Sequence, residues 1–147
     1  MTTRGLPVIF SGDEVGRLAG DWPYNRPDFP PPGVWDRRTL SHYRALVALR
    51  RLHPSLTRGE HRNLLARGDL LVFLRWWEDA QGSVADAAIV AVNRGSAPQR
   101  VDLPFPPELS GASPLRGVTA SGGRMRFEAP AMDAIVLVAG RIFAAPR

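Results

Sequence analysis

The sequence contains no cysteine and no lysine among its 147 residues. Without cysteine, the chain has no disulfide framework, no thiolate nucleophile and no cysteine-based metal site. All 19 basic residues are arginine, and with 14 acidic residues they give a net charge of +5. Because the arginines are spread along the chain without an aromatic-interleaved block, we interpret them as a solvated surface, and nucleic-acid binding is the weaker alternative.

Long apolar runs are also missing. The apolar run near the start, residues 5–10, is short and leads into an acidic Gly-Asp-Glu segment, which is neither a signal peptide nor a membrane-spanning helix. No other segment is a candidate for a membrane span, so we expect no membrane contact. The lack of cysteine carries no information on redox compartment, and the cytoplasm is the default expectation.

Length limits the possible folds. At roughly 100–200 residues per domain, the chain makes one domain, or one small domain with an appendage. A complete (β/α)8 barrel needs about 250 residues, so a resemblance to a barrel enzyme has to be a resemblance to part of one. The hydrophobic content of 44% predicts a buried core, and 14 glycines with 14 prolines predict many turns and few long helices.

Three stretches of different character open the chain. Residues 5–10 are apolar with β-branched positions, which is typical of a buried strand in a parallel sheet. Residues 11–35 hold five prolines, four glycines, two tryptophans and one tyrosine, which predict a long packed or ligand-facing loop. From Asp36, a candidate N-cap, apolar residues recur at helical spacing as far as Leu52, and Pro54 ends the helix.

The remainder of the chain alternates short apolar runs with turn residues. Glycine-containing turns separate these runs at about the spacing of a β-sandwich. The predicted fold is therefore mainly β, an antiparallel β-sandwich preceded by one strand, a long loop and one amphipathic helix. The seven predicted strands are residues 63–66, 70–77, 87–93, 100–103, 114–118, 124–128 and 134–139.

Few polar side chains are spaced for catalysis. The histidines, His42, His53 and His61, lack metal-ligand spacing, so we interpret them as structural and predict no metal and no cofactor. No nucleophile-elbow motif occurs, and serine hydrolysis is not expected. Asp13 and Glu14 directly follow the first predicted strand, where either substrate contact or a plain turn role fits.

Aromatic side chains with hydrogen-bonding neighbours suggest a carbohydrate site. Residues 21–26, DWPYNR, combine aromatic faces with polar groups, and a pyranose presents apolar faces and hydroxyl edges. Loop packing with an ion pair is the alternative. Trp76 and Trp77 invite the same idea, but strand alternation turns one of them inward, so core packing is preferred.

Several segments carry motifs of a known enzyme family. Residues 5–16, GLPVIFSGDEVG, are similar to G-x-P-x-I-x-x-G-D-E-x-G, which forms barrel strand eight and the start of its loop in the α-amylase family, glycoside hydrolase family 13. Residues 25–30, NRPDFP, resemble the D-P-x-N-R-x-P-F segment of its neopullulanase, cyclomaltodextrinase and maltogenic amylase group. Residues 42–56, HYRALVALRRLHPSL, resemble the last barrel helix, and residues 71–75, 89–93 and 129–137 resemble strands of the β-sandwich that follows the barrel.

The resemblance implies the C-terminal part of an α-amylase-like enzyme. Residues 1–56 would be the end of the (β/α)8 barrel and residues 57–147 the C-terminal β-sandwich domain. The parent chemistry would be retaining hydrolysis of α-glucosidic bonds in maltodextrin, pullulan or cyclic glucans. A retaining glycosidase needs two carboxylates about 5 Å apart, but none of the family's catalytic carboxylates maps onto this chain. We therefore predict no catalytic residue here and no activity for the isolated chain.

Four loop residues are the substrate-binding candidates that the resemblance implies: Arg26, Asn25, Asp21 and Tyr24. In the full-length parent they would hydrogen-bond to, or stack on, a distal glucose of an α-glucan oligosaccharide. The match departs from the family at Trp22, which stands where the motif has aspartate and leaves Asp21 one place away.

The first predicted strand lacks its barrel neighbours, so residues 5–10 are expected to pair with another chain or with an exposed sheet edge. The expected partners are an α-glucan in the parent and either a complementary barrel chain or a second copy of this chain. No nucleic acid and no membrane are expected. The alternative function is a non-catalytic glucan-binding or structural β-sandwich module.

Overall fold

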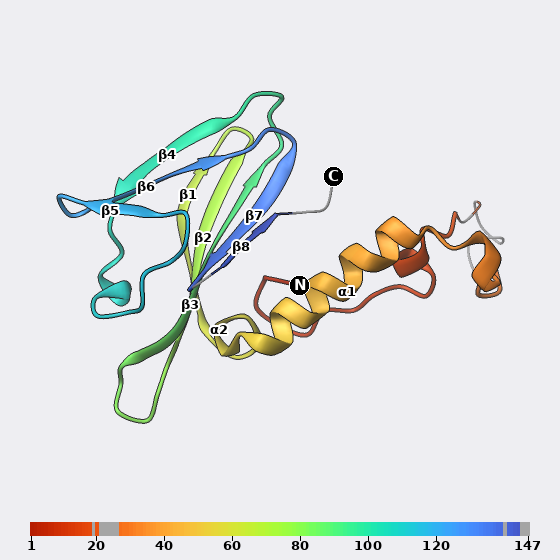
Figure 1. Cartoon of the computed structure of the whole chain (residues 1–147), viewed down its shortest axis with the longest axis horizontal. Helices are drawn as coiled ribbons and strands as arrows, with labels where there is room; N and C mark the ends of the chain where they lie inside the picture. The colour runs from red at the N-terminus through yellow and green to blue at the C-terminus, as the bar shows by residue number, and fades with distance from the viewer. Residues whose placement is uncertain (19, 21–26, 140, 145–147) are drawn as a thin grey trace.

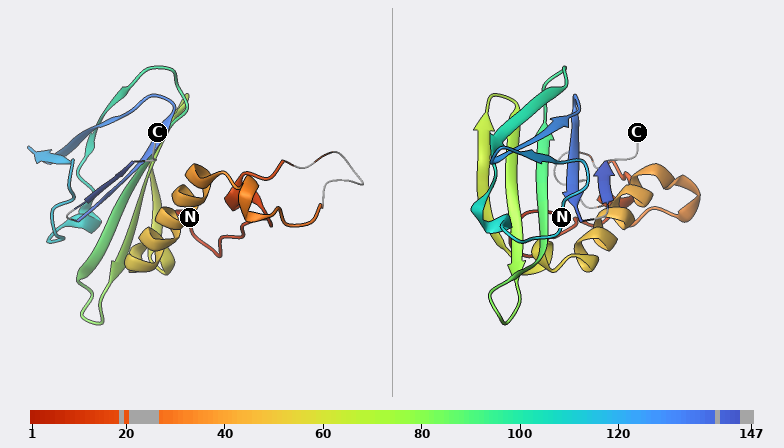
Figure 2. Two further views of the ribbon diagram at one scale, coloured as in Figure 1. Left: turned by 45° about the vertical axis from the view of Figure 1, so that its right-hand side comes forward. Right: turned by 60° about the vertical axis from the view of Figure 1, so that its left-hand side comes forward.

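A β-sandwich and a projecting arm make up the computed structural model, which describes residues 1–18, 20, 27–139 and 141–144. The arm consists of the described residues up to position 52, and it projects from one side of the sandwich (Figure 1). The same separation is visible when the molecule is turned about the vertical axis (Figure 2).

Helix α1, Arg37–Leu52, forms most of the arm. Its N-cap is Asp36, whose side chain accepts hydrogen bonds from the backbone N–H groups of Arg38 and Thr39, as helix N-caps do. The helix ends before Pro54, so the predicted helix and both of its ends are confirmed. No helix in the described part of the chain is long and apolar enough to cross a membrane.

The short helices complete the helical content of the described residues. Helix α2, Pro54–Thr57, follows α1 directly, because proline is favoured in the first turn of a helix although it ends the preceding one. The sequence pattern does not predict α2. The 3-10 turns are η1, Asp13–Val15, η2, Pro32–Val34, and η3, Pro107–Leu109.

The strands form two antiparallel sheets, which confirms the predicted β-sandwich. The five-stranded sheet has the order β1-β2-β3-β7-β8, and the three-stranded sheet has the order β4-β6-β5. The large sheet comprises β1 Glu60–Arg67, β2 Leu70–Glu78, β3 Val84–Asn93, β7 Asp133–Val138 and β8 Arg141–Ala144. The small sheet comprises β4 Gln99–Pro104, β5 Thr119–Ser121 and β6 Arg124–Ala129.

Five of the seven predicted sandwich strands lie within observed strands, the strand predicted at 134–139 matches β7 except for its last residue, and the prediction of a strand at 114–118 is wrong. That segment makes only an isolated bridge, between Leu115 and Ala139. Gly117 has a φ of 83°, a left-handed conformation that breaks an extended ladder. The sequence pattern also misses β5 and β8, which are too short to show an alternating pattern.

The strand predicted for residues 5–10 is not present. The segment has no β pairing in the described structure, and Leu6 and Val8 are 94% and 91% exposed. A parallel strand exists through hydrogen bonds to its neighbours. The structure brings no parallel neighbour to this segment, so the prediction of a buried strand is wrong for this chain.

The main core fills the space between the two sheets. Alternate residues of β2, namely Leu70, Val72 and Leu74, point into it and are at most 1% exposed. They pack with Met125 and Phe127 of β6 on the facing sheet. This alternation of inward and outward residues is the packing of two stacked sheets.

A second apolar cluster attaches the arm to the outer face of the large sheet. Leu49 of α1 and Leu56 of α2 are 1% and 0% exposed. They pack on sheet residues from β2, β3 and β7, namely Phe73, Ala88, Val90, Val136 and Val138. Strand β3 is therefore buried on both faces, which explains why residues 87–92 form a continuous apolar run.

We predict that Leu56→Ala lowers the free energy of unfolding by about 2–5 kcal/mol, because it opens a cavity between α2 and the large sheet. Urea unfolding followed by tryptophan fluorescence measures the change. The control is Leu52→Ala, four positions earlier, where the side chain is 66% exposed, and its expected effect is within about 0.5 kcal/mol. Equal effects of the two substitutions would contradict the observed docking of α2.

The cap of α1 predicts a pH dependence. Hydrogen bonds from the Thr39 hydroxyl and then from the Thr39 backbone N–H hold the pKa of Asp36 below its usual value of 3.8. A lowered carboxylate pKa adds stability above the unfolded pKa, and this stability is lost as the pH falls through the lowered folded pKa.

The first turn of α1 should therefore fray selectively below about pH 4, as measured by NMR chemical shifts of the amides of residues 38–42. Asp36→Asn keeps a capping oxygen but does not titrate, so the same amides should lose this pH dependence. Identical titration of these amides in both proteins would show that Asp36 is not its cause.

Candidate functional site

The four predicted substrate-binding residues, Asp21, Tyr24, Asn25 and Arg26, lie outside the described residues. Their contact with a sugar therefore stays a prediction. The structure does describe the segments on either side of them, which make up most of the predicted loop of residues 11–35.

A tight turn precedes the predicted site. Gly12 has a φ of 98° at the start of η1, a conformation that favours glycine. The backbone N–H of Gly12 donates to Oε2 of Glu14 at 2.9 Å, and Val15 is 2% exposed. The Glu14 carboxylate thus caps its own turn, which is the turn role that its sequence position allows. Asp13 is exposed beside it.

Aromatic packing organises the segment that follows the predicted site. The rings of Phe29 and Trp35 lie edge to face, with centroids 5.9 Å apart. The indole N–H of Trp35 donates to the carbonyl of Pro30 at 2.8 Å, and the guanidinium of Arg37 lies 5.2 Å from the Trp35 ring centroid. Trp35 therefore packs within the loop.

Two contacts tie the two segments together. Nη1 of Arg17 donates to the carbonyl of Pro27 at 2.5 Å. The backbone N–H of Asp36 donates to the carbonyl of Val15 at 3.0 Å. The N-cap residue of α1 is therefore hydrogen-bonded to the η1 turn. The described ends of the loop are therefore held against each other and against the start of α1.

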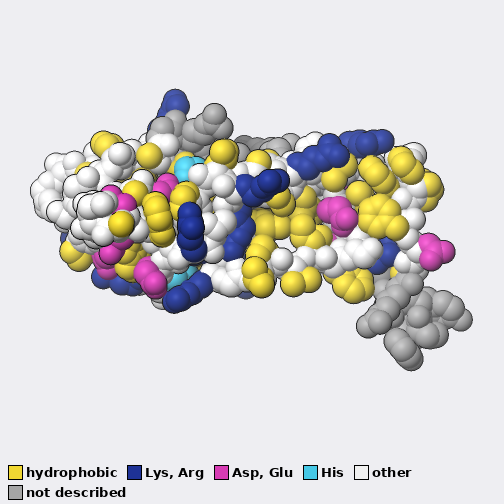
Figure 3. Space-filling model, turned by 90° about the horizontal axis from the view of Figure 1, so that it is seen from below, with side chains coloured by type: hydrophobic (Ala, Val, Ile, Leu, Met, Phe, Trp, Pro, Cys, Tyr) yellow, Lys and Arg dark blue, Asp and Glu magenta, His cyan; other side chains and the backbone are white. Residues whose placement is uncertain are grey.

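A shallow hollow of about 310 Å³ lies between the N-terminal segment and α1. It is lined by Ile9, Glu14, Leu40, Tyr43, Arg44, Val47, Ala48 and Arg51. Figure 3 shows apolar side chains gathered on the underside of this part of the molecule. Only one carboxylate lines the hollow, so its described walls do not offer the pair of carboxylates that glycoside hydrolysis requires.

In the described part of the chain, no group of three or more histidine, aspartate or glutamate side chains is placed to hold a metal ion. The described walls of the hollow are mostly apolar with a few charged side chains, which suits a partner with an apolar surface. They hold no arrangement of catalytic side chains.

The histidines that contact the sandwich have structural partners. Nδ1 of His53 lies 2.9 Å from Oδ1 of Asp86, whose Oδ2 accepts from the Ser55 backbone N–H at 2.9 Å. The ring of His61 stacks on Phe73 at 4.9 Å. These contacts confirm the structural interpretation of both histidines. Sequence reasoning misses Asp86, because its partners lie more than thirty positions away.

The paired tryptophans of β2 have different surroundings. Trp76 is partly buried and packs against the sandwich core, which confirms the preferred interpretation. Trp77 is covered by Arg58, whose guanidinium carbon lies 5.2 Å from its ring centroid. Neither ring belongs to the loop of residues 11–35.

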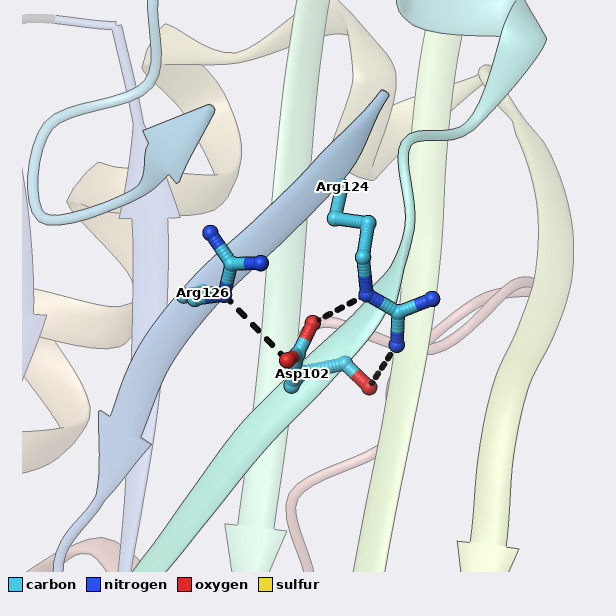
Figure 4. Close-up of polar contacts among 3 residues, drawn as sticks. All are labelled: Asp102, Arg124 and Arg126. Atoms are coloured by element: carbon cyan, nitrogen blue, oxygen red, sulfur yellow. Dashed lines mark hydrogen bonds and ion pairs between the residues drawn. The ribbon is translucent and has the colours of Figure 1, made fainter. Parts of the chain in front are cut away.

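The outer face of the small sheet carries an exposed ion-pair group (Figure 4). Oδ1 of Asp102 on β4 accepts from Nε of Arg124 at 2.6 Å, and Oδ2 accepts from Nε of Arg126 at 3.2 Å. The hydrogen bond from Arg124 is the largest cause that lowers the pKa of Asp102. Because both oxygens are occupied by cations from β6, we interpret this group as a cross-strand brace.

Comparison with known proteins connects these features to enzymes. No protein-family model matches the sequence. The chain is 31% identical to an amylopullulanase of Thermoanaerobacter thermohydrosulfuricus over 159 aligned positions, which cover 97% of this chain and 10% of that protein. It is 34% identical to neopullulanase 2 of Thermoactinomyces vulgaris over 102 positions, which cover 65% of this chain and 16% of that protein.

The fold has solved relatives. The structure of an Anoxybacillus α-amylase superposes with a TM-score of 0.77 and 25% identity, over 99% of this chain and 30% of that chain. The present chain thus spans about a tenth to a sixth of the length of the two curated relatives above. The chain is homologous to the C-terminal part of enzymes of the α-amylase family, glycoside hydrolase family 13, which confirms the resemblance carried by its sequence motifs.

Proposed function

We propose that the chain is the C-terminal portion of an α-glucan-acting glycoside hydrolase, whose complete form performs retaining hydrolysis of α-glucosidic bonds. The observation that carries this proposal is the alignment of 97% of the chain with an amylopullulanase. In this proposal, residues 1–56 are the end of the (β/α)8 barrel and residues 57–147 are the C-terminal β-sandwich domain. The sandwich would brace the barrel through the cluster around Leu49 and Leu56.

The loop would supply substrate contacts to the complete enzyme. Arg26, Asn25, Asp21 and Tyr24 would hydrogen-bond to, or stack on, a glucose distal to the bond that is cleaved. The described flanks support this role, because Arg17 and Asp36 hold the two ends of the loop together. A loop with fixed ends holds its side chains for a ligand at a smaller cost in conformational entropy.

The isolated chain would be inactive. Glu14 caps its own turn, and Asp36 caps helix α1. Retaining hydrolysis needs one carboxylate to attack the anomeric carbon and a second, about 5 Å away, to protonate the leaving oxygen. Glu14 and Asp36 thus have structural partners, and no carboxylate of the sequence corresponds to the family's catalytic pair.

The exposed apolar segment supports a partner chain. Leu6, Val8 and Phe10 are 94%, 91% and 51% exposed, and contiguous apolar surface of this kind marks an interaction site in soluble proteins. The solved α-amylase that contains this fold is more than three times as long as the matched region. We take the missing cover to be a complementary barrel chain.

A non-catalytic glucan-binding or structural module is the second candidate. It is favoured by the sandwich itself, whose core is closed by two sheets of the same chain. Such a module would not need residues 5–10 to be buried.

We expect the purified chain to release no reducing sugar from pullulan or β-cyclodextrin, because it lacks the catalytic carboxylate pair. A colorimetric reducing-sugar assay measures the result, with a commercial pullulanase as the positive control. Activity that disappears on Asp13→Ala or Glu14→Ala would contradict this, since it would place a catalytic carboxylate in the η1 turn.

The exposed segment should also make the isolated chain self-associate when its natural cover is absent. We expect concentration-dependent oligomers in light scattering coupled to size exclusion, and a monomer for the double substitution Leu6→Asp with Val8→Asp. The control is Met132→Asp, because Met132 is 73% exposed in a turn of the sandwich and its positive φ of 49° suits aspartate. A wild-type chain that stays monomeric at high concentration would argue against this docking surface.

A further inference from the structure

Two buried arginines meet where the arm joins the large sheet. Arg50 of α1 is 8% exposed, and Arg75 of β2 is 0% exposed. Burial lowers the pKa of Arg75, and the nearby charges of Arg50 and Arg4 lower it further. Both guanidinium groups donate to carbonyls of residues 1–3, so they lie near each other in a site that is sheltered from water.

Among the described residues, Arg50 donates its side-chain hydrogen bonds to main-chain oxygens of the N-terminal segment. Its Nη1 donates to the carbonyls of Met1 at 2.6 Å and Thr3 at 3.1 Å. Its Nη2 donates to the carbonyl of Gly5 at 2.6 Å. One guanidinium group thus donates hydrogen bonds to three carbonyls within five consecutive residues.

Arg75 links the same segment to the sandwich. Its Nη1 donates to the carbonyl of Thr2 at 2.6 Å. Its Nε and Nη2 donate to the carbonyls of Glu60 and Gly59, each at 3.0 Å. The carbonyls of residues 1–3 and 5 therefore all accept hydrogen bonds from the two arginines. These arginines lie on α1 and β2, 25 positions apart in the sequence.

No carboxylate lies at ion-pair distance from Arg50 or Arg75 among the described residues. Glu60, whose carbonyl Arg75 binds, pairs instead with Arg4 at 3.3 Å, and both of those side chains are largely exposed. Buried cations are normally paired with carboxylates, because desolvation of an unpaired charge is costly. Here the carbonyl dipoles of the N-terminal segment take the place of the carboxylates.

The contacts are made to the backbone and not to the side chains. The side chains of Thr3 and Arg4 are exposed. Gly5 has a φ of 100°, a left-handed conformation that turns its carbonyl toward Arg50 and that favours glycine. The segment is thus recognised through its shape and its carbonyls.

We propose that Arg50 and Arg75 form a binding site for a peptide main chain, with residues 1–5 as its ligand. The site fixes the point and direction from which the apolar segment of residues 6–10 leaves the sandwich. Because the two arginines bind backbone carbonyls, the site tolerates different side chains at positions 2 and 3. This inference rests on the contacts of the junction and does not depend on the proposed hydrolase function.

The test is ¹⁵N relaxation of the full chain, compared among the wild type, Arg50→Met and Arg51→Met. In the wild type, the backbone amides of residues 2–5 should have order parameters of about 0.85, and in Arg50→Met they should fall below about 0.6. Arg51→Met is the matched control, because Arg51 is the exposed neighbour on the same helix, and it should keep these amides ordered. Unchanged chemical shifts in β3 and β7 would show that each variant is folded.

Two further variants separate carbonyl recognition from side-chain packing. Thr2→Ala combined with Thr3→Ala keeps every carbonyl and should leave residues 2–5 ordered. Gly5→Ala removes the favoured left-handed conformation and should loosen them. The proposal is overturned if residues 2–5 are mobile in the wild type, stay ordered in Arg50→Met, or become mobile in the double threonine variant.

Truncation of residues 1–5 provides a stability measurement of the same site. It should lower Tm by about 4 °C or more in the wild type, because it removes the three carbonyl acceptors of Arg50 and one of the three acceptors of Arg75. In the Arg50→Met background the same truncation should cost less than half as much. Equal losses in both backgrounds would overturn the proposal.

Discussion

The apolar contact between the end of helix α1, helix α2 and the outer face of the large sheet is the constraint on which the remaining structure depends. Leu49 and Leu56 close this contact and bring Arg50 over Arg75. The hydrophobic effect supplies the attachment, which is proportional to the area removed from water. The hydrogen bonds of the two arginines then orient the N-terminal segment, because hydrogen bonds are directional and apolar contacts are not.

The same geometry explains why the sandwich buries its apolar side chains while the arm exposes some of its own. The two sheets of the sandwich bury each other's apolar faces. The arm instead holds its segment of residues 5–10 outward, with Leu6 and Val8 almost fully exposed. Among the described residues, this segment has no cover. Because the segment is anchored at both ends, pairing with the proposed partner chain would cost less conformational entropy.

Local sequence rules succeed where the determining contacts are close in the chain. Helix α1 is predicted from Asp36 to Leu52, because its cap and its apolar spacing are local signals. The prediction fails at residues 114–118, where the conformation of Gly117 matters more than the apolar composition. It also fails at residues 5–10, whose composition suits a parallel strand that has no neighbours here. The candidate sugar-binding residues 21–26 remain a prediction from motif resemblance, while the structure defines the packing of Trp35 and Glu14 beside them.

Local propensity, alternation and motifs are sufficient to predict the helix, most strands of the sandwich and the relationship to the α-amylase family. Which polar groups meet depends instead on how the elements pack. Arg50 and Arg75 look like ordinary basic residues in the sequence, yet they bind carbonyls that lie between 45 and 73 positions away. The physical reason is that burial of a charge depends on the packing of whole elements, and neither α1 nor β2 alone excludes water from its arginine.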